Sequence, residues 1–120
     1  MLKEDLKQFY GTEYYYPITP NVVITDGVKY FANKAQAYWL VTDIAINGMM
    51  HDKLKPEKFI VIKTKKANGG INVRYEDGNY NLLLEEDYPL SDLPDDGEYT
   101  LWMETNVILL PGEHWCTVKK

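Results

Sequence analysis

Residues for covalent cross-links and nucleophilic catalysis are nearly absent from this sequence. Cys116 is the only cysteine among 120 residues, so no disulfide can form within the chain. Ser91, the only serine, lies in a proline-rich loop without the Gly-x-Ser-x-Gly context of a hydrolase nucleophile. His51 and His114 are the only histidines, and no second cysteine completes a metal site with them. We therefore predict no catalytic residue, no metal site and no enzymatic activity.

Long apolar runs and phosphate-binding motifs are absent as well. No stretch approaches the roughly 20 apolar residues that span a bilayer, and residues 1–9 are too charged for a signal peptide. Neither G-x-G-x-x-G nor G-x-x-x-x-G-K-[ST] occurs. Residues 77–79 begin like a calcium loop, but the later ligands are missing, so a turn is the better interpretation. We expect a cytoplasmic protein without a cofactor.

Charge is unevenly distributed along the chain, whose formal net charge is −5. Residues 51–75 hold seven basic and two acidic residues, whereas residues 76–98 hold nine acidic residues and no lysine or arginine. Closely spaced carboxylates can mimic a nucleic-acid backbone and bind a protein, although a solvated acidic sheet edge explains them too. The candidate acidic surface consists of Glu76, Asp77, Glu85, Glu86, Asp87, Asp92, Asp95 and Asp96.

The basic segment offers a different interpretation. Lysines on strands could track an RNA or DNA backbone while Phe59 and Tyr75 stack on bases. Alternating lysines also protect sheet edges from pairing, so both interpretations stay open. The candidate nucleic-acid-binding residues are Lys58, Lys63, Lys65, Lys66 and Arg74.

The longest predicted element is a helix at residues 33–47, apolar nearly all round and therefore expected to be buried on more than one side. Before it, the sequence predicts a strand at 22–24, a turn at 25–27, and a strand or lead-in at 28–31. A short amphipathic helix is expected at 2–9.

The second half of the chain has the period of two that is typical of strands. Short turns between them make neighbouring strands antiparallel. The predicted fold is a single α+β domain with a mostly antiparallel sheet of about five strands packed on one long helix. Strands are expected at 59–64, 71–76, 80–85, 99–104 and 107–110.

Several motifs resemble a family of small bacterial proteins of unknown function found on phages, plasmids and other mobile elements. The matching segments lie in order over residues 8–113, and the densest is 25–30, Thr-Asp-Gly-Val-Lys-Tyr. Tyr80 stands where members have a second glycine, and residues 111–114 read Pro-Gly-Glu-His instead of Pro-Ser-Glu-Tyr. The other matches are Phe9-x-Gly-Thr-Glu, 37–40 with 43–45, 77–79, 88–90, 101–102 and 107–111.

The resemblance supplies no catalytic residues, but it implies a class of function. Small acidic proteins of mobile elements often bind host proteins, including the nucleases that anti-CRISPR proteins inhibit. The leading hypothesis is therefore a non-enzymatic inhibitor that binds a host protein or ribonucleoprotein, and the nucleic-acid-binding module is the second.

A third hypothesis is a small enzyme that uses Asp26, or the acidic cluster at 85–87, beside an aromatic pocket. Tyr30, Tyr38 and Trp39 would form that pocket. Polar residues near the turn at 25–27 also serve simply to fix it. Further functional candidates are Asp26, Lys29, Tyr30, Tyr15 and Trp102.

Overall fold

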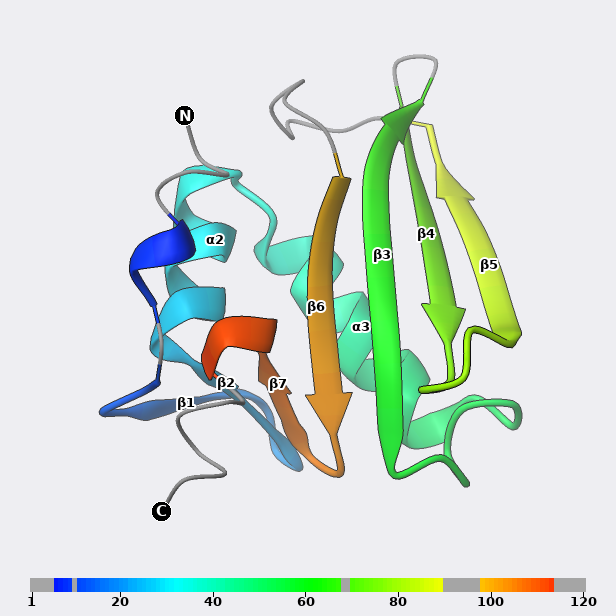
Figure 1. Cartoon of the computed structure of the whole chain (residues 1–120), viewed down its shortest axis with the longest axis horizontal. Helices are drawn as coiled ribbons and strands as arrows, with labels where there is room; N and C mark the ends of the chain where they lie inside the picture. The colour runs from blue at the N-terminus through cyan, green and yellow to red at the C-terminus, as the bar shows by residue number, and fades with distance from the viewer. Residues whose placement is uncertain (1–5, 10, 68–69, 90–97, 114–120) are drawn as a thin grey trace.

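The computed structural model describes residues 6–9, 11–67, 70–89 and 98–113. They form an α+β domain, as predicted, with a seven-stranded sheet (Figure 1). Its elements in chain order are η1 (Leu6–Gln8), β1 (Tyr15–Thr19), β2 (Val22–Thr25), α2 (Asp26–Lys34), α3 (Tyr38–Met50), β3 (Phe59–Ala67), β4 (Gly70–Glu76), β5 (Leu82–Tyr88), β6 (Glu98–Glu104) and β7 (Val107–Leu109).

The strand order is β1-β2-β7-β6-β3-β4-β5, and every neighbouring pair is antiparallel except β2 and β7. The predicted hairpins are therefore confirmed. The parallel contact, with Val23 opposite Val107, was not predicted because the two strands lie far apart in the sequence. Strand β1 was also missed, since it contains Pro17. A proline is tolerated there because β1 lies at the edge of the sheet.

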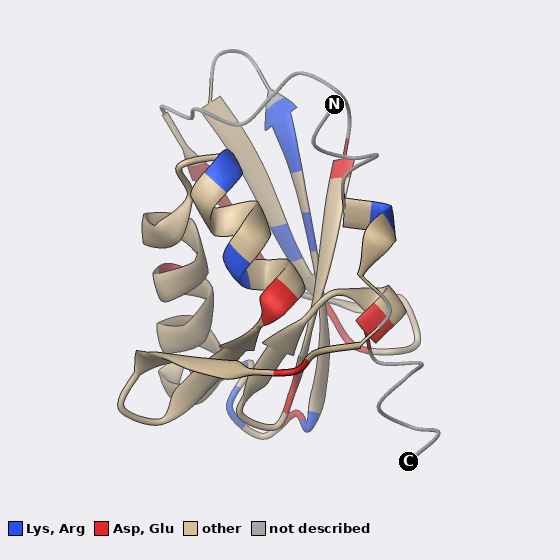
Figure 2. Cartoon of the chain, turned by 90° about the vertical axis from the view of Figure 1, so that its left-hand side faces the viewer, with Lys and Arg blue, Asp and Glu red and all other residues tan. Residues whose placement is uncertain are grey.

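Both α-helices cover the same face of the sheet (Figures 1 and 2). The ring of Phe31 in α2 lies 5.4 Å from that of Tyr99 in β6. Asn47 of α3 donates a hydrogen bond of 3.1 Å to the hydroxyl of Tyr75 in β4. The side chains that alternate with these buried ones project from the opposite face of the strands, which neither α2 nor α3 covers.

The single helix predicted at 33–47 is wrong, because two helices meet at a break. Ala35 ends α2, and Gln36 has a φ of 52°, which an α-helix cannot continue. The predicted turn at 25–27 is instead the start of α2, with Thr25 as the N-cap that accepts a hydrogen bond from the N–H of Val28. Thr-Asp-Gly suits a turn and a helix start equally well, so the local sequence did not distinguish them.

The expectation that the long helix is buried on more than one side is also wrong. Only one stripe of α3 is buried in the described structure, and it includes Leu40 and Ile44. Trp39, Ile46 and Met50 are exposed on the outer side. Asp43 is the only charged residue on this helix.

A buried carboxylate joins the segment after β7 to the start of α2. Glu113 is fully buried, and it accepts hydrogen bonds from the Thr25 hydroxyl at 2.5 Å, the Gly27 N–H at 2.9 Å and the Leu110 N–H at 2.9 Å. Burial raises the pKa of Glu113, and these three donors oppose that rise. The positive end of the α2 dipole favours the charged form as well.

Replacing Glu113 by glutamine tests this connection. In Glu113→Gln an amide NH₂ replaces one of the two carboxylate oxygens, and an NH₂ group cannot accept a hydrogen bond. At least one of the three buried donors therefore loses its acceptor. We expect the free energy of unfolding in urea to fall by about 2 kcal/mol. Glu13→Gln, at an exposed position, should change it by less than about 0.5 kcal/mol. Equal stability of the two variants would contradict the proposed connection.

Candidate binding site on the open face of the sheet

The uncovered face of β3, β4, β5 and β6, which we call the open face, carries polar and aromatic side chains in cross-strand rows. In one row Lys63 of β3 lies between Thr100 and Arg74, with Glu85 beyond. The next row contains Glu98, Lys65, Asn72 and Asp87, and the row on the other side contains Trp102, Val61 and Glu76.

A pocket of about 400 Å³ opens on this face, and we call it the aromatic pocket. The rings of Phe59 and Trp102 meet edge to face at a centroid distance of 5.1 Å. Tyr80, which is 83% exposed, stands at the turn after β4. The full lining is Phe59, Val61, Lys63, Glu76, Asp77, Gly78, Tyr80, Thr100, Trp102 and Pro111.

An ion pair lies in the aromatic pocket. The Nζ atom of Lys63 is 3.2 Å from Oε1 of Glu76, and the two side chains are 28% and 9% exposed. The same Nζ lies 5.6 Å from the centre of the Tyr80 ring. A donor and an acceptor are thus held side by side between aromatic surfaces, which is the usual composition of a ligand site.

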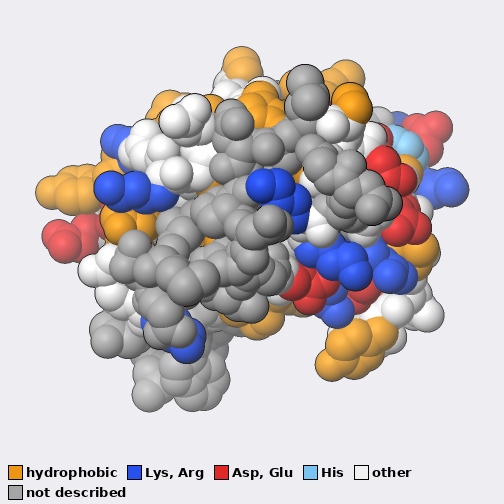
Figure 3. Space-filling model, turned by 90° about the horizontal axis from the view of Figure 1, so that it is seen from above, with side chains coloured by type: hydrophobic (Ala, Val, Ile, Leu, Met, Phe, Trp, Pro, Cys, Tyr) orange, Lys and Arg blue, Asp and Glu red, His pale blue; other side chains and the backbone are white. Residues whose placement is uncertain are grey.

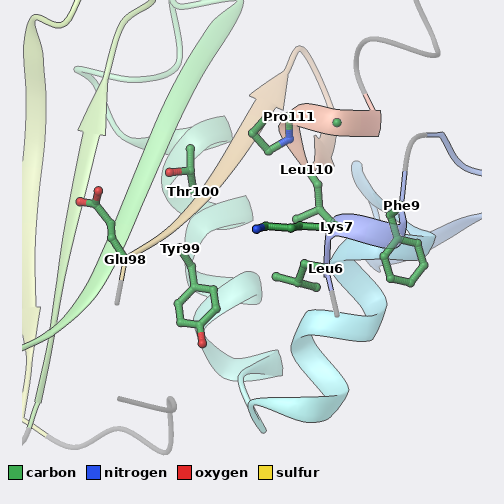
Figure 4. Close-up of a pocket in the computed structure, with 9 residues that line it drawn as sticks. Leu6, Lys7, Phe9, Glu98, Tyr99, Thr100, Leu110 and Pro111 are labelled. Atoms are coloured by element: carbon green, nitrogen blue, oxygen red, sulfur yellow. The ribbon is translucent and has the colours of Figure 1, made fainter. Parts of the chain in front are cut away.

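A second pocket, of about 430 Å³, adjoins the first (Figure 4). It lies beyond the end of β7, where residues 98–101 of β6 pair only with β3. Thr100 and Pro111 line both pockets, so the two pockets are neighbours. The remaining lining residues are Leu6, Lys7, Phe9, Glu98, Tyr99, Leu110 and Gly112.

The candidate acidic residues do not share one surface. Glu85 and Asp87 project from the open face, where both accept hydrogen bonds from Nδ2 of Asn72 at 2.8 and 2.9 Å. Glu86 projects from the opposite face and accepts hydrogen bonds from Asn47 and the Tyr88 hydroxyl. Glu76 and Asp77 line the aromatic pocket, whereas Asp92, Asp95 and Asp96 lie outside the described residues.

Three of the candidate basic residues share the open face: Lys63, Lys65 and Arg74. Lys66 alternates with Lys65 and so projects from the other face, and Lys58 precedes β3. Basic side chains lie directly beside acidic ones on the side of the molecule seen in Figure 3. The expected stacking by Tyr75 is wrong, because this side chain is fully buried under the helices.

A separate cluster surrounds the first turn of α2. Asp26 accepts hydrogen bonds from the Glu13 N–H at 2.8 Å and the Tyr16 hydroxyl at 2.9 Å. Burial acts to raise the pKa of Asp26, but these hydrogen bonds outweigh it and lower the pKa. The Nζ atom of Lys29 lies 4.0 Å from the centre of the Tyr16 ring, and Tyr15 beside it is 51% exposed. The cluster holds β1 against α2.

Tyr30 and Trp39, which the enzyme hypothesis places in one pocket, pack on different residues. Tyr30 packs on Phe9, with ring centroids 5.3 Å apart, while Trp39 packs on Tyr88 at 5.2 Å. Among the described residues, no group of three or more His, Cys, Asp and Glu side chains is placed to hold a metal ion. No helix in the described part of the chain is long and apolar enough to cross a membrane.

Sequence reasoning missed Glu113, Tyr80 and Pro111. Pro111 was interpreted as the stop after the last predicted strand, Glu113 as part of a short tail, and Tyr80 as the start of a strand. The structure instead places Tyr80 in the turn, with a φ of 69°. One signal for a turn at Tyr80 was available in the sequence. The family that the chain resembles has a glycine at this position, and glycine favours a positive φ.

Residues 1–114 match a family of unknown function, DUF6876. The chain belongs to this family. Searches of curated proteins and of solved structures found no match. Membership in DUF6876 assigns no activity and no site residue.

The ion pair in the aromatic pocket predicts a stability change. Lys63→Met leaves Glu76 shielded from water without its cation, and we expect a loss of about 2 kcal/mol in the free energy of unfolding, since Lys63 is partly exposed. The double variant Lys63→Met/Glu76→Met should recover at least half of that loss, because neither charge remains. Urea denaturation measures both. A double variant no more stable than the single one would argue against a coupled pair.

The lowered pKa of Asp26 predicts a dependence on pH. A carboxyl whose pKa is lower in the folded state than its ordinary value of 3.8 stabilises the fold above that value, and the contribution is lost as pH falls through the folded pKa. Asp26→Asn should therefore cost about 1 kcal/mol near neutral pH. The difference from the wild type should vanish in strong acid. A difference that is constant across urea titrations at several pH values would refute this assignment.

Proposed function

We propose that this chain is a non-enzymatic binding protein that engages a host protein or ribonucleoprotein through its open face. The observation that supports this proposal is the aromatic pocket, where Trp102, Tyr80 and the Lys63–Glu76 pair converge. Aromatic and arginine side chains are enriched in recognition surfaces, and Arg74 lies next to the pocket in the row of Lys63.

The mixed charge of the open face favours recognition by complementarity over pure mimicry of a nucleic-acid backbone. An acidic mimic needs its carboxylates on one accessible surface. Here Glu86 projects from the other face, and Glu76 is shielded and paired with Lys63. The open face instead presents Glu85 and Asp87 at one edge and Lys65 and Arg74 beside them.

The biological role we propose is inhibition of a host defence system, in the manner of anti-CRISPR proteins, by a cytoplasmic protein of a phage or other mobile element. The support for this role is the resemblance of the sequence motifs, together with the aromatic pocket on the open face. A resemblance of this kind indicates a class of function and not a particular partner.

Capture from a bacterial host lysate tests the proposal. The tagged wild type should retain a specific partner, and Trp102→Ala should reduce its recovery at least about tenfold, because buried aromatic side chains dominate binding energy. Tyr80→Ala should act in the same direction without a folding defect, since this side chain is exposed. Tyr14→Ala is the matched control, because Tyr14 is 63% exposed and lies outside both pockets.

Either of two results would contradict the proposal. A partner recovered in equal amounts by the wild type, Trp102→Ala and Tyr80→Ala would place the binding surface elsewhere. Failure of the wild type to retain any partner from the lysate would remove the host-binding function. Circular dichroism of each variant separates loss of binding from loss of fold.

A further inference from the structure

The charges of the open face differ in whether they already have partners. Glu76 is paired with Lys63, and Glu85 and Asp87 both accept hydrogen bonds from Asn72. Lys65 and Arg74 are exposed and make no ion pair or side-chain hydrogen bond with a described residue. Unpartnered cations next to a pocket are suited to bind an anion.

The pocket beside these cations is suited to a flat, polar ring. Trp102 and Phe59 provide half-buried aromatic surfaces, and Tyr80 stands exposed at the turn. Single-stranded nucleic acids are commonly bound by stacking bases on aromatic side chains that project from an open sheet. The pocket volume of about 400 Å³ falls in the range of small-molecule sites.

The Lys63–Glu76 pair adds hydrogen-bonding groups for the edge of such a ring. A lysine ammonium has three donors, and a carboxylate accepts at both oxygens, so the pair keeps further capacity after forming its contact of 3.2 Å. Nucleobases place donors and acceptors next to each other on one edge. An adjacent donor and acceptor in the pocket would meet that pattern.

From these observations we infer that the aromatic pocket binds an unpaired nucleotide of a single-stranded nucleic acid, whose backbone lies along Lys65 and Arg74. The inference rests on the proposed function and specifies its partner as a ribonucleoprotein or another complex that exposes a single strand. Glu98 of β6 and the acidic residues of β5 border this basic track on its two sides. They limit the contact to a few phosphates.

The geometry favours a nucleotide over an acidic peptide. An acidic peptide would use the cations but not the aromatic rings, whereas a nucleotide uses both. A duplex would not fit either, because its bases are stacked on one another and cannot enter a pocket.

Fluorescence anisotropy with labelled probes tests this inference on the full chain. The probes are pools of fluorescein-labelled single-stranded RNA decamers, single-stranded DNA decamers of the same composition, duplex RNA and a poly-glutamate peptide. We expect the single strands to bind, and both Tyr80→Ala and Trp102→Ala to weaken binding at least about tenfold. Preference for RNA or for DNA identifies which strand the partner exposes.

Salt dependence and charge variants supply a second readout. Because few phosphates are contacted, the double logarithmic slope of affinity against salt should be shallow, about −1 to −2. Lys65→Gln/Arg74→Gln should weaken binding and flatten that slope further. The matched control is Lys34→Gln on α2, which is exposed and lies outside both pockets; it should leave affinity and slope unchanged.

Three results would overturn the inference: no binding of any single strand, binding that Tyr80→Ala and Trp102→Ala leave intact, or equal affinity for the duplex or poly-glutamate. Nuclease treatment of the host lysate distinguishes failure of this inference from failure of the proposed function. If capture of a partner depends on Trp102 and survives nuclease, and no oligonucleotide binds, the inference of a bound nucleotide is wrong. The proposal of a protein partner is then retained. Oligonucleotide binding without any captured partner would retain the nucleotide and remove the host-binding function.

Discussion

The arrangement of this domain depends on one buried carboxylate. Glu113 binds the Thr25 hydroxyl and two backbone N–H groups, one from the first turn of α2 and one from the chain just after β7. These bonds fix the end of the parallel β2–β7 pair against the start of the first helix. They also hold the Leu110–Gly112 segment next to β6, where Pro111 lines both pockets. The same interaction therefore closes the fold and shapes the wall of the site.

The second constraint is that both helices cover one face of the sheet. The hydrophobic core lies on that side, where Ile62, Tyr75 and Leu101 are fully buried. The open face is then free to hold polar and aromatic side chains that the core does not require. Strand pairing fixes their register, so Trp102 and Lys63 reach the same pocket from neighbouring strands. A rigid sheet of this kind presents a site with little conformational cost on binding.

How far the sequence predicted the structure depended on whether local patterns were sufficient. Alternation in residues 59–64 and 99–104 predicted β3 and β6 well, because period-two burial is a local property. The start of α2 was missed because Thr25 caps the helix in concert with Glu113, which is 88 residues away in the sequence. The aromatic pocket was not predicted either. Lys63, Glu76 and Trp102 were all named as candidates, but for different surfaces, and only the strand register brings them together.

We propose that ligands bind the open face and not the exposed apolar side of α3. The indole N–H signals of Trp102 and Trp39 report on these two surfaces separately in a ¹H–¹⁵N NMR spectrum. When a partner protein or an oligonucleotide is added, we expect the Trp102 signal to shift or broaden while the Trp39 signal stays in place. A shift of Trp39 with Trp102 unchanged would contradict this proposal.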